Sequence, residues 1–75
     1  YQINVNAIAP GSFPDPEFGD PEAREARRRA AASAVPLGRG GDPREVGMLA
    51  LFLVSDASNY LTGETIYLDG GASSA

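Results

Sequence analysis

The sequence predicts an α/β fold in which two short strands run parallel, with helices between them. Three observations lead to this prediction: an alternating apolar segment near the start, two helix-initiation motifs, and a β-branched segment near the end. A strand, a helix and a second strand in this order form a right-handed unit with parallel strands. A two-stranded parallel sheet has two faces to cover, so we expect it to need more cover than 75 residues supply.

The first strand is predicted over residues 2–9. Its odd-numbered positions are apolar and share one face: Ile3, Val5, Ala7 and Ala9. This period of two is typical of a strand. Pro10 cannot donate to a neighbouring strand and Gly11 permits unusual backbone angles, so we expect the strand to stop before them. Ligands of open α/β sheets bind at the carboxyl ends of strands, which makes the following loop a candidate site.

Residues 12–19 are predicted to form a loop, because two prolines and a glycine interrupt any regular helix or central strand. The loop carries Phe13 and Phe18. These rings either pin the loop to the domain or line a substrate pocket, and the position after a strand end leaves both interpretations open.

The first helix is predicted to begin after Asp20, which can cap free amides, with Pro21 at its first position. It is expected to run to about Ala34, with Glu25 in reach of Arg28 and Arg29. Four alanines form its predicted packing stripe: Ala23, Ala26, Ala30 and Ala34. The arginines of residues 24–29 are expected to form a solvated face, with an anionic-substrate site as the alternative.

The second helix is predicted over residues 43–55, with Asp42 as its cap and Glu45 at its third position. Its second half is apolar nearly all round, so we expect a sheet on one side and either the rest of the domain or another subunit on the other. The glycine-rich connector of residues 35–41 lacks the spacing of a phosphate-binding loop and is expected to be a turn. Residues 65–68 have the β-branched and aromatic content of a short strand.

Composition excludes several classes of function. The chain has no Cys, no His and a net charge of -4, and all six of its basic residues are Arg. Without His or Cys we expect no metal site, and an acidic chain disfavours nucleic acid as a partner. No apolar run approaches the ~20 residues that cross a membrane, so we expect a cytoplasmic protein without membrane contact. The start at Tyr1, without Met, suggests further upstream sequence.

Several motifs occur together in a recognisable order: Asn4–Gly11, Val35–Arg39, Asp42–Val46, Phe52–Asp56, Leu61–Gly63 and Asp69–Gly71. In this order and spacing they resemble the last third of a short-chain dehydrogenase/reductase. The resemblance implies an α/β fold that is the C-terminal portion of a Rossmann-type doubly wound parallel sheet, with its last two strands and the helices between them. It therefore implies a single segment, residues 1–75, of one such domain.

The resemblance also implies a function. The parent protein would be an NAD(P)-dependent oxidoreductase that transfers hydride between the nicotinamide of NAD or NADP and a small-molecule carbonyl or secondary alcohol. The implied cofactor-binding residues follow the first strand: Pro10, Gly11, Ser12, Phe13 and Asp15. Residues 12–35 would form the substrate lid, with Phe13 and Phe18 binding substrate. The family usually has Thr five residues after the Pro, in contact with the cofactor carboxamide, where this chain has Asp15.

The catalytic residues of the family have no counterpart here, because its glycine-rich loop, its Ser and its Tyr-x-x-x-Lys pair precede the matching region. The 75-residue chain alone is therefore expected to be inactive. The resemblance further implies a homo-oligomer formed through the Leu49–Val54 helix and the Thr65–Leu68 strand. The alternative is a non-catalytic assembly module that folds only with a partner chain, because so short a chain leaves much of its apolar helix exposed.

Overall fold

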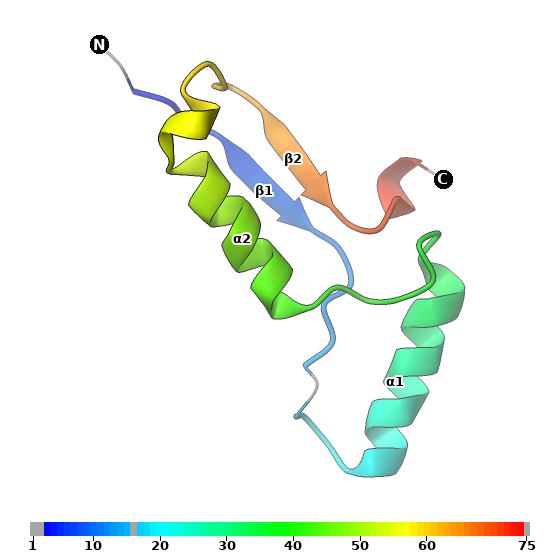
Figure 1. Ribbon diagram of the computed structural model, residues 1–75. Helices are drawn as coiled ribbons and strands as arrows, with labels where there is room; N and C mark the ends of the chain where they lie inside the picture. The colour runs from blue at the N-terminus through cyan, green and yellow to red at the C-terminus, as the bar shows by residue number, and fades with distance from the viewer. Residues whose placement is uncertain (1–2, 16, 75) are drawn as a thin grey trace.

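The computed structural model describes residues 3–15 and 17–74. In chain order the elements are β1 (Ala7–Pro10), α1 (Pro21–Ala34), α2 (Pro43–Leu53), the 3-10 turn η1 (Asp56–Ser58), β2 (Thr65–Leu68) and the 3-10 turn η2 (Ala72–Ser74). β1 and β2 are parallel neighbours with α2 alongside, whereas α1 lies beyond the carboxyl ends of the strands (Figure 1). Two parallel strands with intervening helices confirm the predicted fold class.

The pairing register gives the small sheet two different faces. Ile8 pairs with Ile66, and Ala9 with Tyr67. Side chains of directly paired residues lie on the same face, and successive residues alternate between faces. One face therefore carries Ile8 and Ile66, which are half-buried, and the other carries Tyr67, which is 62% exposed. α2 covers the first face, and the second face is open.

The first strand begins later than predicted, at Ala7 instead of residue 2, which lies outside the described residues. Before Ala7, side-chain hydrogen bonds hold the chain beside the segment that precedes β2. The Asn4 side-chain amide donates to the carbonyls of Asn59 (2.9 Å) and Leu61 (3.1 Å). The Asn6 side chain accepts from the Glu64 N–H at 3.1 Å. The two asparagines thus clip the start of the chain to the segment before β2.

The strand also ends one residue later than predicted, because β1 includes Pro10. Ala7 N–H donates to Glu64 O just before β2 (2.9 Å), and Gly11 N–H donates to Leu68 O at its end (2.9 Å), so the donors toward this side lie at odd-numbered positions. In a parallel pair, the N–H of the residue between two such donors points away from the partner strand. Pro10 occupies such a position, so its missing N–H removes no bond from the ladder.

α1 has the predicted cap, because Asp20 Oδ1 accepts from the Ala23 N–H at 2.8 Å. Glu25 pairs with Arg28 (2.5 Å) and Arg29 (3.8 Å), as predicted. The predicted alanine stripe is wrong: of its members only Ala23 is shielded, and the others are exposed. The face turned inward follows a spacing of four: Ala23, Arg27, Ala31 and Val35. This face is selected because the loop before α1 folds against Arg27, and Val35 packs on Gly70.

α2 ends at Leu53, two residues before the predicted end. Ser55 stops it, because its hydroxyl donates to the Phe52 carbonyl (2.7 Å) and accepts from the Ala57 N–H (3.3 Å) at the start of η1. A half-buried stripe faces the sheet: Val46, Leu49, Ala50 and Leu53. The outer side is also apolar but exposed, as the sequence predicted for a helix that needs cover on two sides: Met48, Leu51 and Phe52.

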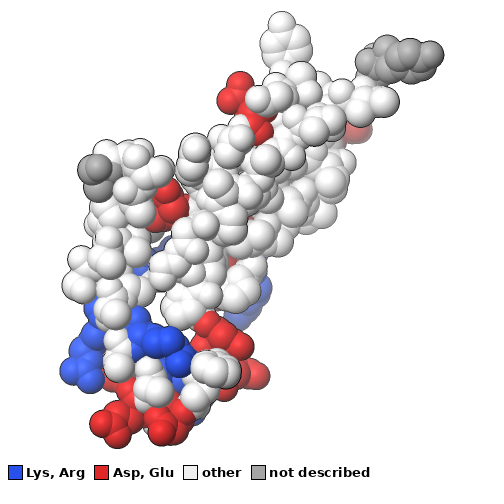
Figure 2. All heavy atoms as spheres, turned by 180° about the vertical axis from the view of Figure 1, so that it is seen from behind, with Lys and Arg blue, Asp and Glu red and all other residues white. Residues whose placement is uncertain are grey.

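The described part of the chain is elongated. It measures 51 × 27 × 14 Å and has a radius of gyration of 15.0 Å, against roughly 11 Å for a compact domain of this length. Among its residues only Ala31, Val35 and Ser58 are buried. In Figure 2 the charged side chains gather mainly at the end of the molecule that holds α1, and the remainder is largely uncharged. No helix in the described ranges is long and apolar enough to span a membrane.

Candidate functional site

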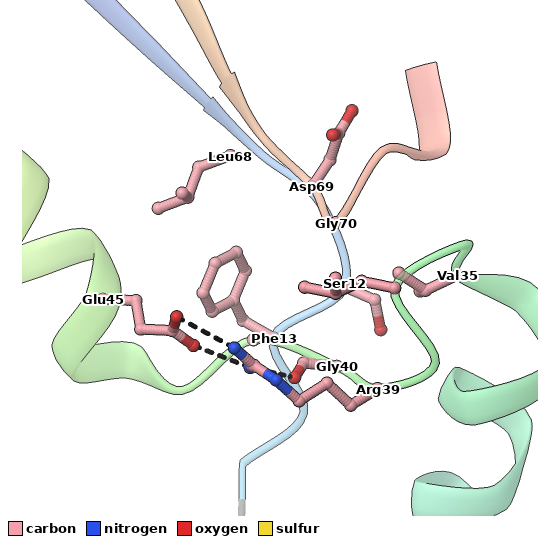
Figure 3. A pocket seen from close by; sticks show the side chains of 11 residues that line it. Ser12, Phe13, Val35, Arg39, Gly40, Glu45, Leu68, Asp69 and Gly70 are labelled. Carbon is pink, nitrogen blue, oxygen red and sulfur yellow. Dashed lines mark hydrogen bonds and ion pairs between the residues drawn. The ribbon is translucent and has the colours of Figure 1, made fainter. Parts of the chain in front are cut away.

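The carboxyl ends of β1 and β2 meet around a small cavity of about 70 Å³. Three parts of the chain enclose it: the segment after β1, the connector between α1 and α2, and the segment after β2. Figure 3 shows Ser12 and Phe13, Arg39 and Gly40, and Leu68 to Gly70 gathered there, with Glu45 at one side. The cavity lies where the sequence predicted a ligand-binding edge.

Gly11 allows the two strand ends to approach closely. A Cβ atom at this position would lie 2.7 Å from Asp69 Cβ and 2.9 Å from Asp69 Cα. Because one of these atoms is backbone, the contact could not be relieved by turning a side chain. The Gly11 N–H donates to the Leu68 carbonyl at 2.9 Å. The loop after β1 therefore starts from a fixed position.

Phe13 packs against a second glycine. A Cβ atom at Gly41 would lie 2.2 Å from the Phe13 ring, so only glycine fits beneath it. The Gly41 N–H also donates to the Ser12 carbonyl at 2.7 Å. The Phe13 ring points into the cavity, on the side of Leu68 and Glu45 (Figure 3). These contacts agree with the first interpretation of this ring, in which it pins the loop to the domain.

The backbone of the same loop offers hydrogen-bond donors. Within residues 3–15 and 17–74, the N–H groups of Ser12 and Phe13 donate to no protein acceptor. They follow directly on Gly11, whose own N–H is used by β2. An unused backbone donor that follows a fixed strand end is available to an acceptor such as a carboxamide oxygen, which accepts hydrogen bonds in its own plane.

Asp15 and Phe18 lie in a different place. Asp15 Oδ1 accepts from the Glu17 N–H at 2.9 Å, and Phe18 lies under the guanidinium of Arg27, 5.3 Å from ring centroid to Cζ. Asp15 borders a larger groove of about 440 Å³ between the loop and α1. The groove is also lined by Pro14, Ala31, Gly40 and four charged residues of α1: Arg24, Glu25, Arg27 and Arg28. Phe18 and Phe13, which the resemblance groups as substrate-binding, are therefore separated in the structure.

A bidentate ion pair fixes the connector to α2. Arg39 Nη1 and Nη2 donate to the two carboxylate oxygens of Glu45 at 2.8 and 3.1 Å, and Glu45 Oε1 accepts from the Asp42 N–H at 2.9 Å. The hydrogen bond from Arg39 and then that from Asp42 lower the pKa of Glu45 to about 2. The predicted capping box is thus present and is extended by Arg39.

Comparison with known proteins identifies the family. A family profile described as Enoyl-(Acyl carrier protein) reductase matches residues 1–73. The chain belongs to the short-chain dehydrogenase/reductase family. It corresponds to the C-terminal region of these dehydrogenases, as the order of its motifs suggested.

Relatives of this dehydrogenase segment differ in what their names say they act on. The 3-oxoacyl-[acyl-carrier-protein] reductase of Thermotoga maritima is 48% identical over 69 residues, which are 92% of this chain and 27% of the relative. A putative 2-deoxy-d-gluconate 3-dehydrogenase of Agrobacterium tumefaciens with bound NADP is 36% identical, with a TM-score of 0.76 over 96% of this chain and 29% of its own. A 4-hydroxyisoleucine dehydrogenase complexed with NADH is 26% identical, with a TM-score of 0.78 over 97% of this chain and 30% of its own.

The dehydrogenase segment spans about a quarter of the length of the curated relatives it matches. Structures of its relatives hold either NADH or NADP.

Three residues of this region make contacts that their sequence pattern does not predict. Gly41 and Arg39 lie in the connector of residues 35–41, which the sequence predicts only as a turn. An Arg six residues before a capping Glu is the signal that could have indicated the ion pair between Arg39 and Glu45. Arg27 was placed on a solvated face, whereas it is half-buried against the loop. Its spacing of four from Ala23 and Ala31 is the signal that could have indicated this.

Proposed function

We propose that this chain is the C-terminal segment of an NAD(P)-dependent oxidoreductase, which we call the parent dehydrogenase. The parent would transfer hydride between the nicotinamide and a carbonyl or secondary alcohol. The observation that carries this proposal is the loop after β1, where a backbone fixed by Gly11 presents two unused donors at the carboxyl end of a parallel sheet. The family membership and the cofactors of its relatives support it.

In this proposal the residues after β1 form the nicotinamide-side wall. When bound, the nicotinamide supplies or accepts the hydride. Pro10 and Gly11 set the backbone position, and the N–H group of Ser12 or of Phe13 would donate to the carboxamide oxygen. Asp15 lies further along the same loop and contributes to the border between cofactor and substrate. Holding one reactant in place in this way removes translational and rotational freedom before the chemical step.

The groove between the loop and α1 would receive the substrate. Its walls combine Pro14 and Ala31 with charged side chains: Asp15, Glu25 and three arginines of α1, Arg24, Arg27 and Arg28. The Phe18 ring, 68% exposed at this end of the molecule, would contact substrate or exclude water from it. The general acid/base of the family lies outside the matching region, so we expect the 75-residue chain alone to be inactive.

The uncovered apolar surface would bind a second subunit. Large apolar side chains on the outer side of α2 and just after it are exposed: Met48, Leu51, Phe52 and Val54. Tyr67 of β2 is also exposed, but it lies on the face of the sheet turned away from α2 and would form a separate part of the interface. Exposed patches of this kind mark interfaces. The same patch supports a second candidate, a non-catalytic assembly module, which would fold with a partner and have no activity.

The experiment is an assay of the parent dehydrogenase with NADH and with NADPH. Two carbonyl probes, a 3-oxoacyl thioester and a keto-sugar acid, represent the chemistry in the names of two of these relatives. We expect oxidation of one reduced cofactor with at least one probe, and calorimetric binding of that cofactor. A folded parent that binds neither dinucleotide would contradict the proposal and favour the assembly module. As a control, the isolated 75-residue chain should bind neither.

Replacement of Asp15 tests whether this residue lies at the border between cofactor and substrate. We expect Asp15→Thr in the parent dehydrogenase to change the KM for the cofactor or kcat by up to about tenfold, or about 1.4 kcal/mol, because it removes a charge and supplies a hydroxyl donor. Steady-state kinetics measure this effect. Glu17→Thr, two residues along the same exposed loop, is the matched control, and equal kinetics for the two variants would place Asp15 away from the reacting groups.

Glu45 gives the stability of the parent dehydrogenase a predictable dependence on pH. Its pKa is lowered from 4.5 to about 2 in the folded chain. At pH values above 4.5, the ionised Glu45 carboxylate therefore stabilises the fold. This contribution is lost as the pH falls from 4.5 to about 2. We expect Glu45→Gln to flatten that part of the curve, measured as the urea midpoint at low ionic strength.

Glu22→Gln is the control for this prediction, because Glu22 lies exposed in the first turn of α1. We expect it to leave the curve of the parent unchanged in this window. A Glu45→Gln curve as steep as that of the parent would show that the pair with Arg39 does not form in solution.

A further inference from the structure

Arg27 differs from the arginines beside it on α1. Arg28 and Arg29 are exposed and pair with Glu25. Arg27 is half-buried and reaches backward to the loop before the helix, where its Nη2 donates to the Phe18 carbonyl and, at 3.4 Å, to the Asp15 carbonyl. Its guanidinium also lies over the Phe18 ring, with Cζ 5.3 Å from the centroid. One side chain thus contacts the loop through two carbonyls and a ring.

The loop is shaped to receive this guanidinium. Gly19 has a φ of +90°, which L side chains rarely adopt, and a Cβ atom there would lie 3.3 Å from both Arg27 Nη1 and Ala23 Cβ. On the other side, the Asp15 carboxylate accepts from the Glu17 N–H, and the Asp15 carbonyl accepts from the Phe18 N–H at 3.4 Å. The turn therefore presents its carbonyls toward α1, where Arg27 can reach them.

We propose that Arg27 is the positioning residue of the substrate lid: it holds Asp15 and Phe18 against α1 and so sets the wall of the groove beside Asp15. Arg27 itself borders that groove, together with Pro14 and Asp15. Charge-assisted hydrogen bonds to carbonyls are roughly twice as strong as neutral ones, and the stacked ring adds a cation–π contact. Without Arg27 the loop would lose these attachments, while the caps of α1 and α2 would remain. The assignment of the groove to substrate rests on the proposed function, but the attachment of the loop does not.

Hydrogen exchange in the parent dehydrogenase tests the attachment without cofactor or substrate. We expect Arg27→Ala to speed exchange in peptides covering residues 17–20 by about tenfold, because a charge-assisted contact closes this turn. Arg29→Ala, on the same helix but paired only with Glu25, should leave these peptides unchanged. Peptides from α2 report whether each variant is folded.

Two further variants separate the contribution of the positive charge from that of the ring. Arg27→Lys retains a cation that can donate to one carbonyl and lie over the ring, so it should restore slow exchange in part. Phe18→Leu removes only the ring, at an exposed position, and should give a smaller increase than Arg27→Ala. Exchange in Arg27→Ala equal to that in Arg29→Ala, or no restoration by lysine, would overturn the proposal. A parent that binds no dinucleotide would instead contradict the proposed function and leave the exchange result intact.

Discussion

Gly11→Ala in the parent dehydrogenase is expected to lower the free energy of unfolding by about 1–3 kcal/mol and to weaken cofactor binding. The added methyl group would meet the Cα and Cβ of Asp69 at 2.9 and 2.7 Å. Relief requires the ends of β1 and β2 to separate, which stretches the bond from Gly11 N–H to the Leu68 carbonyl. The same movement displaces Ser12 and Phe13, whose N–H groups we assign to the carboxamide.

Gly47→Ala is the matched control for this substitution. Gly47 lies within α2, and a Cβ atom there would meet nothing within 4 Å. Alanine favours a helix over glycine by roughly 0.5–1 kcal/mol, so this variant should be slightly more stable than the parent. Urea unfolding and calorimetric titration with the preferred dinucleotide measure both effects. If Gly11→Ala retained the stability and affinity of the parent, the strand ends would not approach as closely as described.

Leu51→Glu is expected to dissociate the oligomer of the parent dehydrogenase. Leu51 is 69% exposed at the outer side of α2, within the apolar surface that we assign to a second subunit. Burial of a leucine side chain stabilises by roughly 1.5–3 kcal/mol. A two-fold contact repeats the substitution, so the dissociation constant should rise roughly 10²–10⁴-fold. Sedimentation velocity over a range of concentrations measures this change.

Leu37→Glu provides the same substitution at nearly the same exposure, 65%, on the connector before α2. Leu37 lies outside the proposed interface, so its variant should keep the oligomeric state of the parent. Dissociation by both variants would indicate a general effect of added charge. Dissociation by neither would mean that something other than a second subunit covers this side of α2.

The sequence predicted best those features that depend on neighbouring residues. The helix starts at Asp20 and Asp42 follow from caps that act within one turn, and both are present. The extent of the first strand depends on its partner: residues 3–6 have a strand-like pattern, but Asn4 and Asn6 bind the segment before β2 through their side chains. The inner face of α1 likewise depends on a loop that folds back onto it.

The candidate site also combines features that neighbouring residues determine with features that depend on contacts between segments. The strand end at Pro10 and Gly11 could be located because proline and glycine restrict the backbone locally. The separation of Phe13 from Phe18 could not be predicted, because it is set by Gly41 beneath one ring and Arg27 above the other. Both contacts depend on how the connector and α1 fold back onto the loop, and the identity of the ring that each one meets is not encoded in the sequence around the two phenylalanines.

The most direct test of the central claim is a crystal structure of the parent dehydrogenase with its preferred dinucleotide bound. We predict that the carboxamide oxygen of the nicotinamide lies about 3 Å from the backbone nitrogen of Ser12 or Phe13. A nicotinamide bound away from the carboxyl end of β1, or these two N–H groups donating to protein atoms in that complex, would contradict the account.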